Sequence, residues 1–125
     1  MNAPLDQWQI IVVRTGQRLA TRAAMASTWL ARMQGLLGRQ SLEVGQALIL
    51  PRCTSIHTWG MRCAMDAVFV DRRWRVVALQ PALAPWRMVG PLRRAWGVVE
   101  AGAGTVQRLG LERGDSLLVV AEGAA

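Results

Sequence analysis

The chain has 125 residues, of which 52% are hydrophobic and 18% are charged. Disordered chains are much poorer in apolar residues, so this composition excludes disorder. A folded chain of this length buries roughly two-thirds of its unfolded surface. We therefore expect residues 1–125 to form one compact domain with an ordinary core, and the two cysteines are too few for a disulfide scaffold.

The formal net charge of +7 is typical of proteins that bind polyanions. All 15 basic residues are arginines, however, and they are spread from Arg14 to Arg113. The adjacent pairs are Arg72-Arg73 and Arg93-Arg94. Because no basic run resembles a nucleic-acid-binding arm or helix, we expect no specific nucleic-acid partner.

The N-terminal residues lack a basic segment followed by a long apolar run, and no stretch approaches the ~20 apolar residues of a membrane span. The sequence thus predicts a soluble cytoplasmic protein without a membrane span. Cys53 and Cys63 would remain thiols in that compartment. Their ten-residue spacing would also permit a disulfide that closes a hairpin in an oxidising compartment.

The first elements along the chain are a hairpin and a helix. The β-branched run 8–13 ends at Thr15-Gly16-Gln17, and the strand-like run 18–21 follows, which predicts a hairpin. From Thr28 to Leu37, apolar residues recur at helical spacing, and Gly38 follows as a stop. This segment predicts an amphipathic helix packed against a sheet.

Short strand-like runs separated by turn signals then recur to the end of the chain. We expect strands at 47–50, 67–70, 75–79, 95–100 and 116–120. Pro81, Pro85 and Pro91 predict an ordered loop over 80–92, and Thr105–Leu109 forms at most one helical turn before Gly110. The predicted fold is mainly β, with antiparallel sandwich- or barrel-like sheets and one short packed α-helix.

One segment concentrates the polar chemistry of the chain. Residues 52–66, RCTSIHTWGMRCAMD, contain the single His, both Cys, two Met and an Asp. The strand predicted at 67–70 follows directly. We expect a polar pocket around the hairpin from His57 to Asp66.

This segment resembles the domain of unknown function 192 family, in which a Cys precedes Ile-His-Thr, an aromatic residue, Gly-Met-Arg and an Asp before a strand. The resemblance covers roughly residues 18–120, and further matches in chain order are Gly35–Arg39, Pro85-Trp86-Arg87, Glu100 with Gly104, Leu109-Gly110-Leu111 and Gly114-Asp115. It implies a mainly β, sandwich-like fold and no established activity. Two positions depart from the family pattern: Cys63 stands where Phe is usual, and Ala64 where Pro is usual. The first argues against a functional role for the Cys63 thiol.

The candidate pocket combines groups able to bind an anion or exchange a proton. Arg62 would hold an anionic group, the Trp86 ring would stack on a ligand, and His57 would act with a nearby carboxylate. A structural role for a buried His57, and a turn role for Asp66, remain the alternatives. The candidate residues are His57, Thr58, Met61, Arg62, Asp66, Trp86 and Glu100.

Three function classes follow from these residues. The first is a binding or accessory domain for a small molecule or a protein partner. The second is a hydrolase or transferase for a small anionic substrate, with His57 as base and Arg62 as anion clamp. A nucleophile pair of Cys53 and His57 has less support from the sequence, because nothing places Cys53 at a helix start.

The third class is a metal-binding protein. Cys53, His57 and Met61 repeat the ligand spacing of blue-copper loops, but one His cannot complete a type 1 site. A Cu(I) site from these soft ligands remains an alternative, although an extended strand would hold Cys53 about 13 Å from His57. No motif indicates a cofactor.

Overall fold

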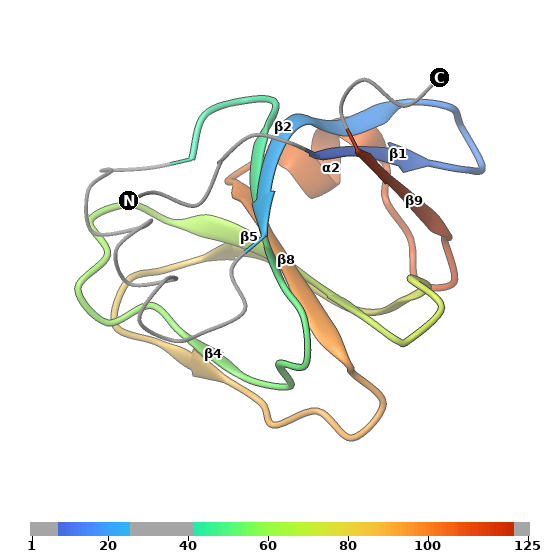
Figure 1. Cartoon of the computed structure of the whole chain (residues 1–125). Coiled ribbons are helices and arrows are strands. Elements are labelled where there is room, and N and C mark those ends of the chain that lie inside the picture. The colour runs from blue at the N-terminus through green and yellow to red at the C-terminus, as the bar shows by residue number, and fades with distance from the viewer. Residues whose placement is uncertain (1–7, 26–41, 122–125) are drawn as a thin grey trace.

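The structure is a computed structural model that describes residues 8–25 and 42–121. Within these ranges strands dominate and one short helix is present (Figure 1). The elements are β1 Trp8–Val12, β2 Arg18–Met25, β3 Gln46–Leu50, β4 Ile56–His57, β5 Met65–Val70, β6 Val76–Leu83, β7 Met88–Val89, β8 Gly97–Gly102, α2 Thr105–Leu109 and β9 Leu117–Ala121.

Seven of these strands form one curled sheet in the order β6-β5-β8-β3-β2-β1-β9, which resembles half a barrel. Neighbouring strands run antiparallel except for β2 and β3, which are parallel. The prediction of a mainly β, barrel-like fold is confirmed, and the sheet is mixed rather than wholly antiparallel. Parallel strands need a long connection instead of a tight turn. The alternation of residues within a strand does not show which strand it pairs with, so the sequence did not predict the parallel β2–β3 pair.

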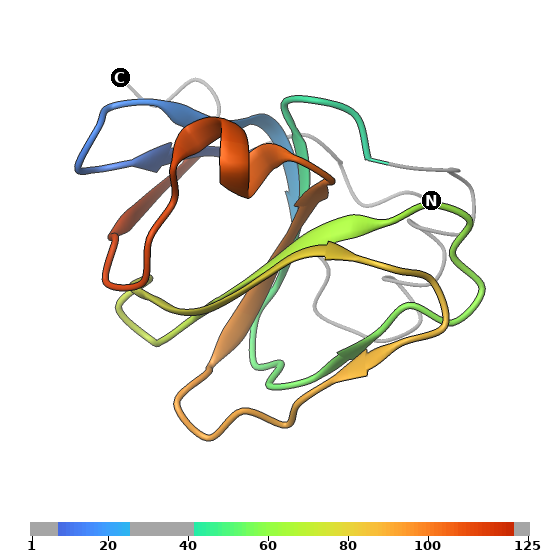
Figure 2. The ribbon, with the colours of Figure 1, turned by 180° about the vertical axis from the view of Figure 1, so that it is seen from behind.

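Strands β4 and β7 form a separate two-stranded ribbon, at the end of the molecule opposite α2 in Figures 1 and 2. Both faces of the central strands are therefore covered, and every residue of β5 and β8 is buried. Val68 and Val99 pack in a core on the α2 side, whereas Phe69 and Val98 pack in a second core with Ile56 of β4. This burial on both faces explains why the two strands are almost continuously apolar.

The predicted hairpin is confirmed as β1 and β2, and the strands expected at 47–50, 67–70, 95–100 and 116–120 correspond to β3, β5, β8 and β9. The strand expected at 75–79 instead continues to Leu83, and β7 also lies within 80–92, so the prediction of a loop over all of 80–92 is wrong. Pro81 is tolerated because β6 is an edge strand, where a missing N–H breaks no ladder. A bulge opposite Asp66 puts Ala82 at a φ of 51°.

The helical turn expected at 105–109 is confirmed as α2, and Gly110 ends it in the left-handed conformation at a φ of 60°. The longer helix predicted for Thr28–Leu37 lies outside the described residues. None of the described helices is long and apolar enough to cross a membrane.

Arg14 ties the β1–β2 turn to the loop before β9. Its Nε donates to Asp115 Oδ1 at 2.6 Å, and its Nη2 donates to Asp115 Oδ2 and to the Gly110 carbonyl, each at 3.0 Å. The Glu112 N–H donates to the same carboxylate at 2.8 Å. The hydrogen bond from Arg14, helped by that of Glu112, lowers the pKa of Asp115 below its ordinary value although burial opposes the shift.

Candidate functional site

Thr58 joins the turn after β4 to the segment before β7. Its buried hydroxyl donates to the Ala84 carbonyl at 2.7 Å and accepts from the Arg87 N–H at 2.9 Å. Its N–H donates to the Arg87 carbonyl at 2.8 Å, while its own carbonyl accepts from the N–H groups of Met61 and Trp86, both at 3.1 Å. These hydrogen bonds cross-link the backbone around Thr58 into a fixed base for the neighbouring side chains.

Large apolar side chains are exposed on this base. The His57 ring lies 4.7 Å from the Trp59 ring, centroid to centroid, and His57 faces Met88 across the β4–β7 ribbon. The exposed fractions are 52% for Trp59, 67% for Trp86 and 61% for Met88. With the exposed arginines of the same segments they form a surface that we call the His57 tip: His57, Trp59, Arg62, Trp86, Arg87 and Met88.

A hollow of about 590 Å³ adjoins the His57 tip. Arg87 and Met88 belong to both, and residues of β6 and the following segment form the remaining wall: Gln80, Ala82, Leu83, Ala84, Val89 and Gly90. This volume lies within the range of about 300–1,000 Å³ that is usual for small-molecule sites.

The backbone also holds Trp86 in an unusual conformation. Its φ is 64°, in the left-handed region that bulky residues rarely adopt. Such a conformation costs about 1–3 kcal/mol and persists only when neighbouring contacts impose it. The hydrogen bond from its N–H to Thr58 is one of those contacts, and the indole ring is thereby presented to solvent.

The structure brings together five of the seven candidate residues, namely Thr58 and, around it, His57, Met61, Arg62 and Trp86. His57 precedes Thr58, the N–H groups of Trp86 and Met61 bind its carbonyl, and the Met61 side chain packs against the core beneath β4. Arg62 follows Met61 and is exposed. All five therefore lie in one region: Thr58 and Met61 belong to its base, and His57, Arg62 and Trp86 lie above them.

Asp66 lies elsewhere. Its two carboxylate oxygens accept hydrogen bonds from the Ala82 N–H in the β6 bulge and from the Val106 N–H at the start of α2, each at 2.8 Å. The residue that precedes α2 is Gly104, which has no side chain to cap the helix, so Asp66 supplies the cap from β5. Asp66 thus has a structural role, but the expected turn is wrong: it lies within β5, and its donors belong to the β6 bulge and to α2. The structure does not bring it to the His57 tip.

Glu100 is fully buried and lies on the opposite face of the sheet from Asp66. Ala67 pairs with Glu100, whereas Asp66 pairs with Ala101, and side chains alternate between the faces of a strand. Glu100 also pairs with Leu48, so it shares the face of the core that β4 and β7 cover. Of the two predicted acids, only Glu100 is on the side of the His57 tip.

Cys53 and Cys63 are both free thiols. The half-buried Cys53 thiol donates to the Ser55 carbonyl at 2.8 Å, and Cys63 is exposed. In the described ranges, no group of three or more His, Cys, Asp and Glu residues could hold a metal ion.

Three members of this surface were not among the candidate residues predicted from the sequence: Trp59, Arg87 and Met88. The pairing of Met88 with His57 makes it a neighbour of the candidate His. Strands of two residues carry no alternation that could reveal such a pairing. The Pro-Trp-Arg sequence at 85–87 was the available signal, because an aromatic ring beside an arginine in a turn is typical of binding surfaces.

The curled sheet and the ribbon that covers one of its faces define a small mainly β domain with an aromatic and basic tip. Residues 10–119 match the model of the domain of unknown function 192 (DUF192) family, described as an uncharacterized ACR. The chain therefore belongs to the DUF192 family, which confirms the resemblance noted in its sequence.

Curated relatives carry the equally neutral name UPF0127 protein. The chain is 33% identical over 109 residues to one from Pyrococcus furiosus, covering 84% of this chain and 92% of that protein. It is 32% identical over 100 residues to one from Thermococcus sibiricus, covering 77% of this chain and 64% of that protein. The chain thus spans just under two-thirds of the longer relative.

Two solved structures share the fold. A chain from Sinorhizobium meliloti, described as a putative transcription regulator, has a TM-score of 0.79 and 20% identity, covering 95% of this chain and 96% of that chain. A protein of unknown function from Novosphingobium aromaticivorans has a TM-score of 0.75 and 21% identity, covering 91% of this chain and 84% of that chain. At these identities the similarity shows the fold alone.

Proposed function

We propose that the protein is a small-molecule-binding domain and that its site is the His57 tip with the adjoining hollow. The ligand class is an organic anion with a planar ring. Trp59 and Trp86 provide ring faces for stacking, and Arg62 and Arg87 provide the charge that would hold a carboxylate or phosphate.

The observation that carries this proposal is the exposure of Trp86, 67% of whose surface meets solvent, on a base fixed by Thr58. A large aromatic ring gains free energy when it leaves water, so a sequence selected only for stability would bury it or replace it. Tryptophan and arginine are also the residue types most enriched where binding energy concentrates. The left-handed backbone of Trp86 supports the same reading, because strained residues gather at functional sites.

Catalysis at the same place is the alternative, with His57 as base and Arg62 as anion clamp. It requires a carboxylate to orient the imidazole; Asp66 is occupied at α2, so this role would fall to the buried Glu100 on the face of the sheet beneath the His57 tip. A binding domain makes no such demand. The two functions differ in whether a bound ligand is released unchanged.

We also propose that the protein works in the cytoplasm. The free Cys53 and Cys63 support this location, because reducing conditions there preserve thiols. Thiol titration of protein purified from its native cells under alkylating conditions should find both cysteines reduced. A Cys53–Cys63 disulfide in that material would contradict the location.

The binding test uses phenyl phosphate as the probe and the indole N–H signals of ¹⁵N-labelled protein as reporters. We expect saturable shifts of the Trp59 and Trp86 signals, with the Trp8 signal in β1 as internal reference. Inorganic phosphate, which lacks a ring, should shift them far less at the same concentration. Arg62→Gln combined with Arg87→Gln should weaken the shifts about tenfold, because charge-assisted hydrogen bonds to the anion are lost.

The matched control replaces two exposed arginines on the α2 side, Arg108→Gln with Arg113→Gln, and leaves the Trp59 and Trp86 shifts unchanged. The absence of saturable shifts at Trp59 and Trp86, or equal weakening by both arginine pairs, would overturn the proposal.

A further inference from the structure

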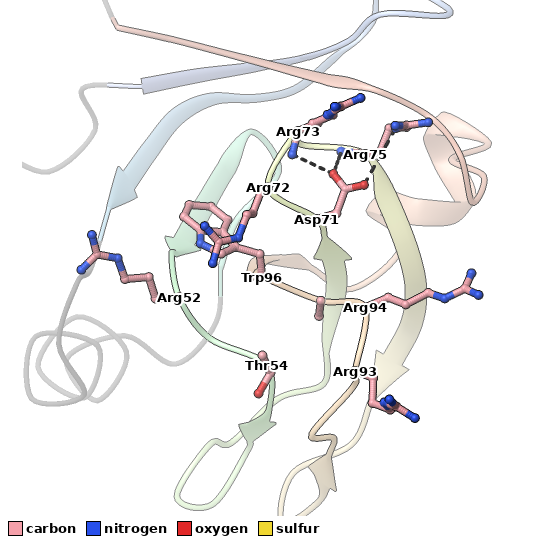
Figure 3. A pocket seen from close by; sticks show the side chains of 10 residues that line it. Arg52, Thr54, Asp71, Arg72, Arg73, Arg75, Arg93, Arg94 and Trp96 are labelled. Carbon is pink, nitrogen blue, oxygen red and sulfur yellow. Dashed lines mark hydrogen bonds and ion pairs between the residues drawn. The ribbon is translucent and has the colours of Figure 1, made fainter.

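A second hollow, of about 830 Å³, lies away from the His57 tip. Three segments that are distant in the sequence form it (Figure 3): the turn after β3, the β5–β6 turn and the segment before β8. Its lining residues are Arg52, Thr54, Asp71, Arg72, Arg73, Arg75, Arg93, Arg94, Ala95 and Trp96. Arginines that are scattered in the sequence are thus gathered in space.

Backbone hydrogen bonds lock the three segments together. The Trp96 N–H donates to the Val70 carbonyl at 2.7 Å, and the Cys53 N–H donates to the Trp96 carbonyl at 2.8 Å. The Leu92 N–H donates to the Thr54 carbonyl at 2.9 Å. The hollow is therefore a fixed feature of the backbone, whereas its arginine side chains are long and exposed.

The charge of this hollow is strongly unbalanced, with six arginines against one aspartate. Asp71 is engaged locally: its Oδ1 accepts from the N–H groups of Arg73 and Arg75 at 2.8 and 3.0 Å, and Oδ2 lies 3.8 Å from the Arg75 guanidinium. Among the described residues, no carboxylate lies within ion-pair distance of Arg52, Arg72, Arg73, Arg93 or Arg94.

In Figure 3 the guanidinium groups of Arg52, Arg93 and Arg94 extend outward from the rim of the hollow. Like charges on neighbouring side chains repel one another. Because these exposed side chains are long, they can turn inward, where a dense anion would relieve the repulsion. Guanidinium groups also match phosphate geometry through paired N–H bonds.

We propose that this hollow binds a compact polyphosphate group, either as an inorganic polyphosphate or as the di- or triphosphate of a nucleotide. A polyphosphate carries several linked anionic groups, which suits arginines that come from three separate segments. This site is independent of the His57 tip, with which it shares no residue.

The lining favours a compact anion over a nucleic-acid strand. Strand-binding grooves combine a basic track with several exposed aromatic faces on which successive bases stack. Trp96 is the aromatic residue of this lining, and it is half-buried with its ring packed edge-on against Trp74 at 5.5 Å. A single, partly covered ring does not make a stacking platform.

The test is isothermal titration calorimetry of the full chain with sodium pyrophosphate, ATP and a short single-stranded DNA, each at physiological salt. We expect saturable one-to-one binding of pyrophosphate and a shift of the Trp96 indole signal in ¹⁵N spectra. Arg72→Gln with Arg94→Gln should weaken this binding at least about tenfold, since these exposed side chains would supply charge-assisted bonds to the phosphates. Arg108→Gln with Arg113→Gln changes the net charge equally and should leave it within about twofold.

Tighter binding of ATP than of pyrophosphate assigns the site to nucleotides, and equal binding assigns it to inorganic polyphosphate; both support the proposal. Lack of saturable pyrophosphate binding, equal weakening by the control pair, or binding of the DNA alone overturns it. Trp96 reports on this hollow and Trp59 and Trp86 on the His57 tip, so either proposal can fail without the other.

Discussion

The two sides of the curled sheet use polar residues in different ways. On the α2 side, Asp66 and Asp115 are buried, and the hydrogen bonds that their carboxylates accept hold α2 and the loop before β9 in place. On the β4–β7 side, the buried hydroxyl of Thr58 supports a surface where Trp59 and Trp86 remain exposed. The buried polar groups of the first side thus stabilise the fold, whereas those of the second side support exposed aromatic rings, which our proposal assigns to ligand binding.

Replacement of Asp66 should have the largest effect on stability. Asp66→Asn keeps the size of the side chain, but its NH₂ group would face the N–H of either Ala82 or Val106 and leave that donor without an acceptor. We expect the free energy of unfolding to fall by about 2–4 kcal/mol, measured by urea denaturation. Phenyl phosphate binding at the His57 tip should persist in the folded fraction.

Asp71→Asn is the matched control for Asp66. Asp71 also accepts two backbone N–H bonds, but at the solvent-exposed β5–β6 turn, where water can replace them. We expect a loss below about 1 kcal/mol. Equal losses of stability in the two variants would show that burial of the carboxylate does not determine its contribution.

Asp115→Asn should lower the free energy of unfolding by about 1–3 kcal/mol, because it disrupts the charge-assisted bonds with Arg14. The pKa of Asp115 is lowered in the folded state, so its stabilising contribution is complete above the unfolded pKa of about 4 and is lost as the pH falls through the folded pKa.

Denaturation of both proteins between pH 7 and pH 2 would check this. The difference in free energy of unfolding should be constant above about pH 5 and should shrink at lower pH. Arg14→Gln should remove most of the same contribution, and a difference that grows with acid would contradict the role of this pair.

Thr58→Val should cost about 1–2 kcal/mol of stability, because the Ala84 carbonyl and the Arg87 N–H lose their side-chain partner. It should also weaken phenyl phosphate binding, since the base under Trp86 loosens. Thr58→Ser retains the hydroxyl and serves as the control, with binding close to that of the native chain. Normal binding of phenyl phosphate by Thr58→Val would show that Thr58 does not support the His57 tip.

The sequence predicted α2 and the strands of the seven-stranded sheet, because alternation, β-branched residues and Gly110 act locally, but it did not predict the short strands β4 and β7. It did not predict that Pro81 lies within a strand, since the edge position of β6 depends on the whole sheet. At the candidate site, the chain motif identified His57, Thr58 and Arg62. Their neighbours Arg87 and Met88 come from the residue before β7 and from β7 itself, and a two-residue strand leaves no periodic signal. The separation of Asp66 from Glu100 depends on strand register.

If the exposed residues of the β4–β7 side serve binding, Trp86→Ala should remove binding without loss of stability. Its indole ring is largely in water, so the free energy of unfolding should change by less than about 0.5 kcal/mol in urea denaturation. In the same sample, the saturable shift of the Trp59 indole signal with phenyl phosphate should be lost. A variant that is clearly destabilised and still shows the Trp59 shift would contradict the account.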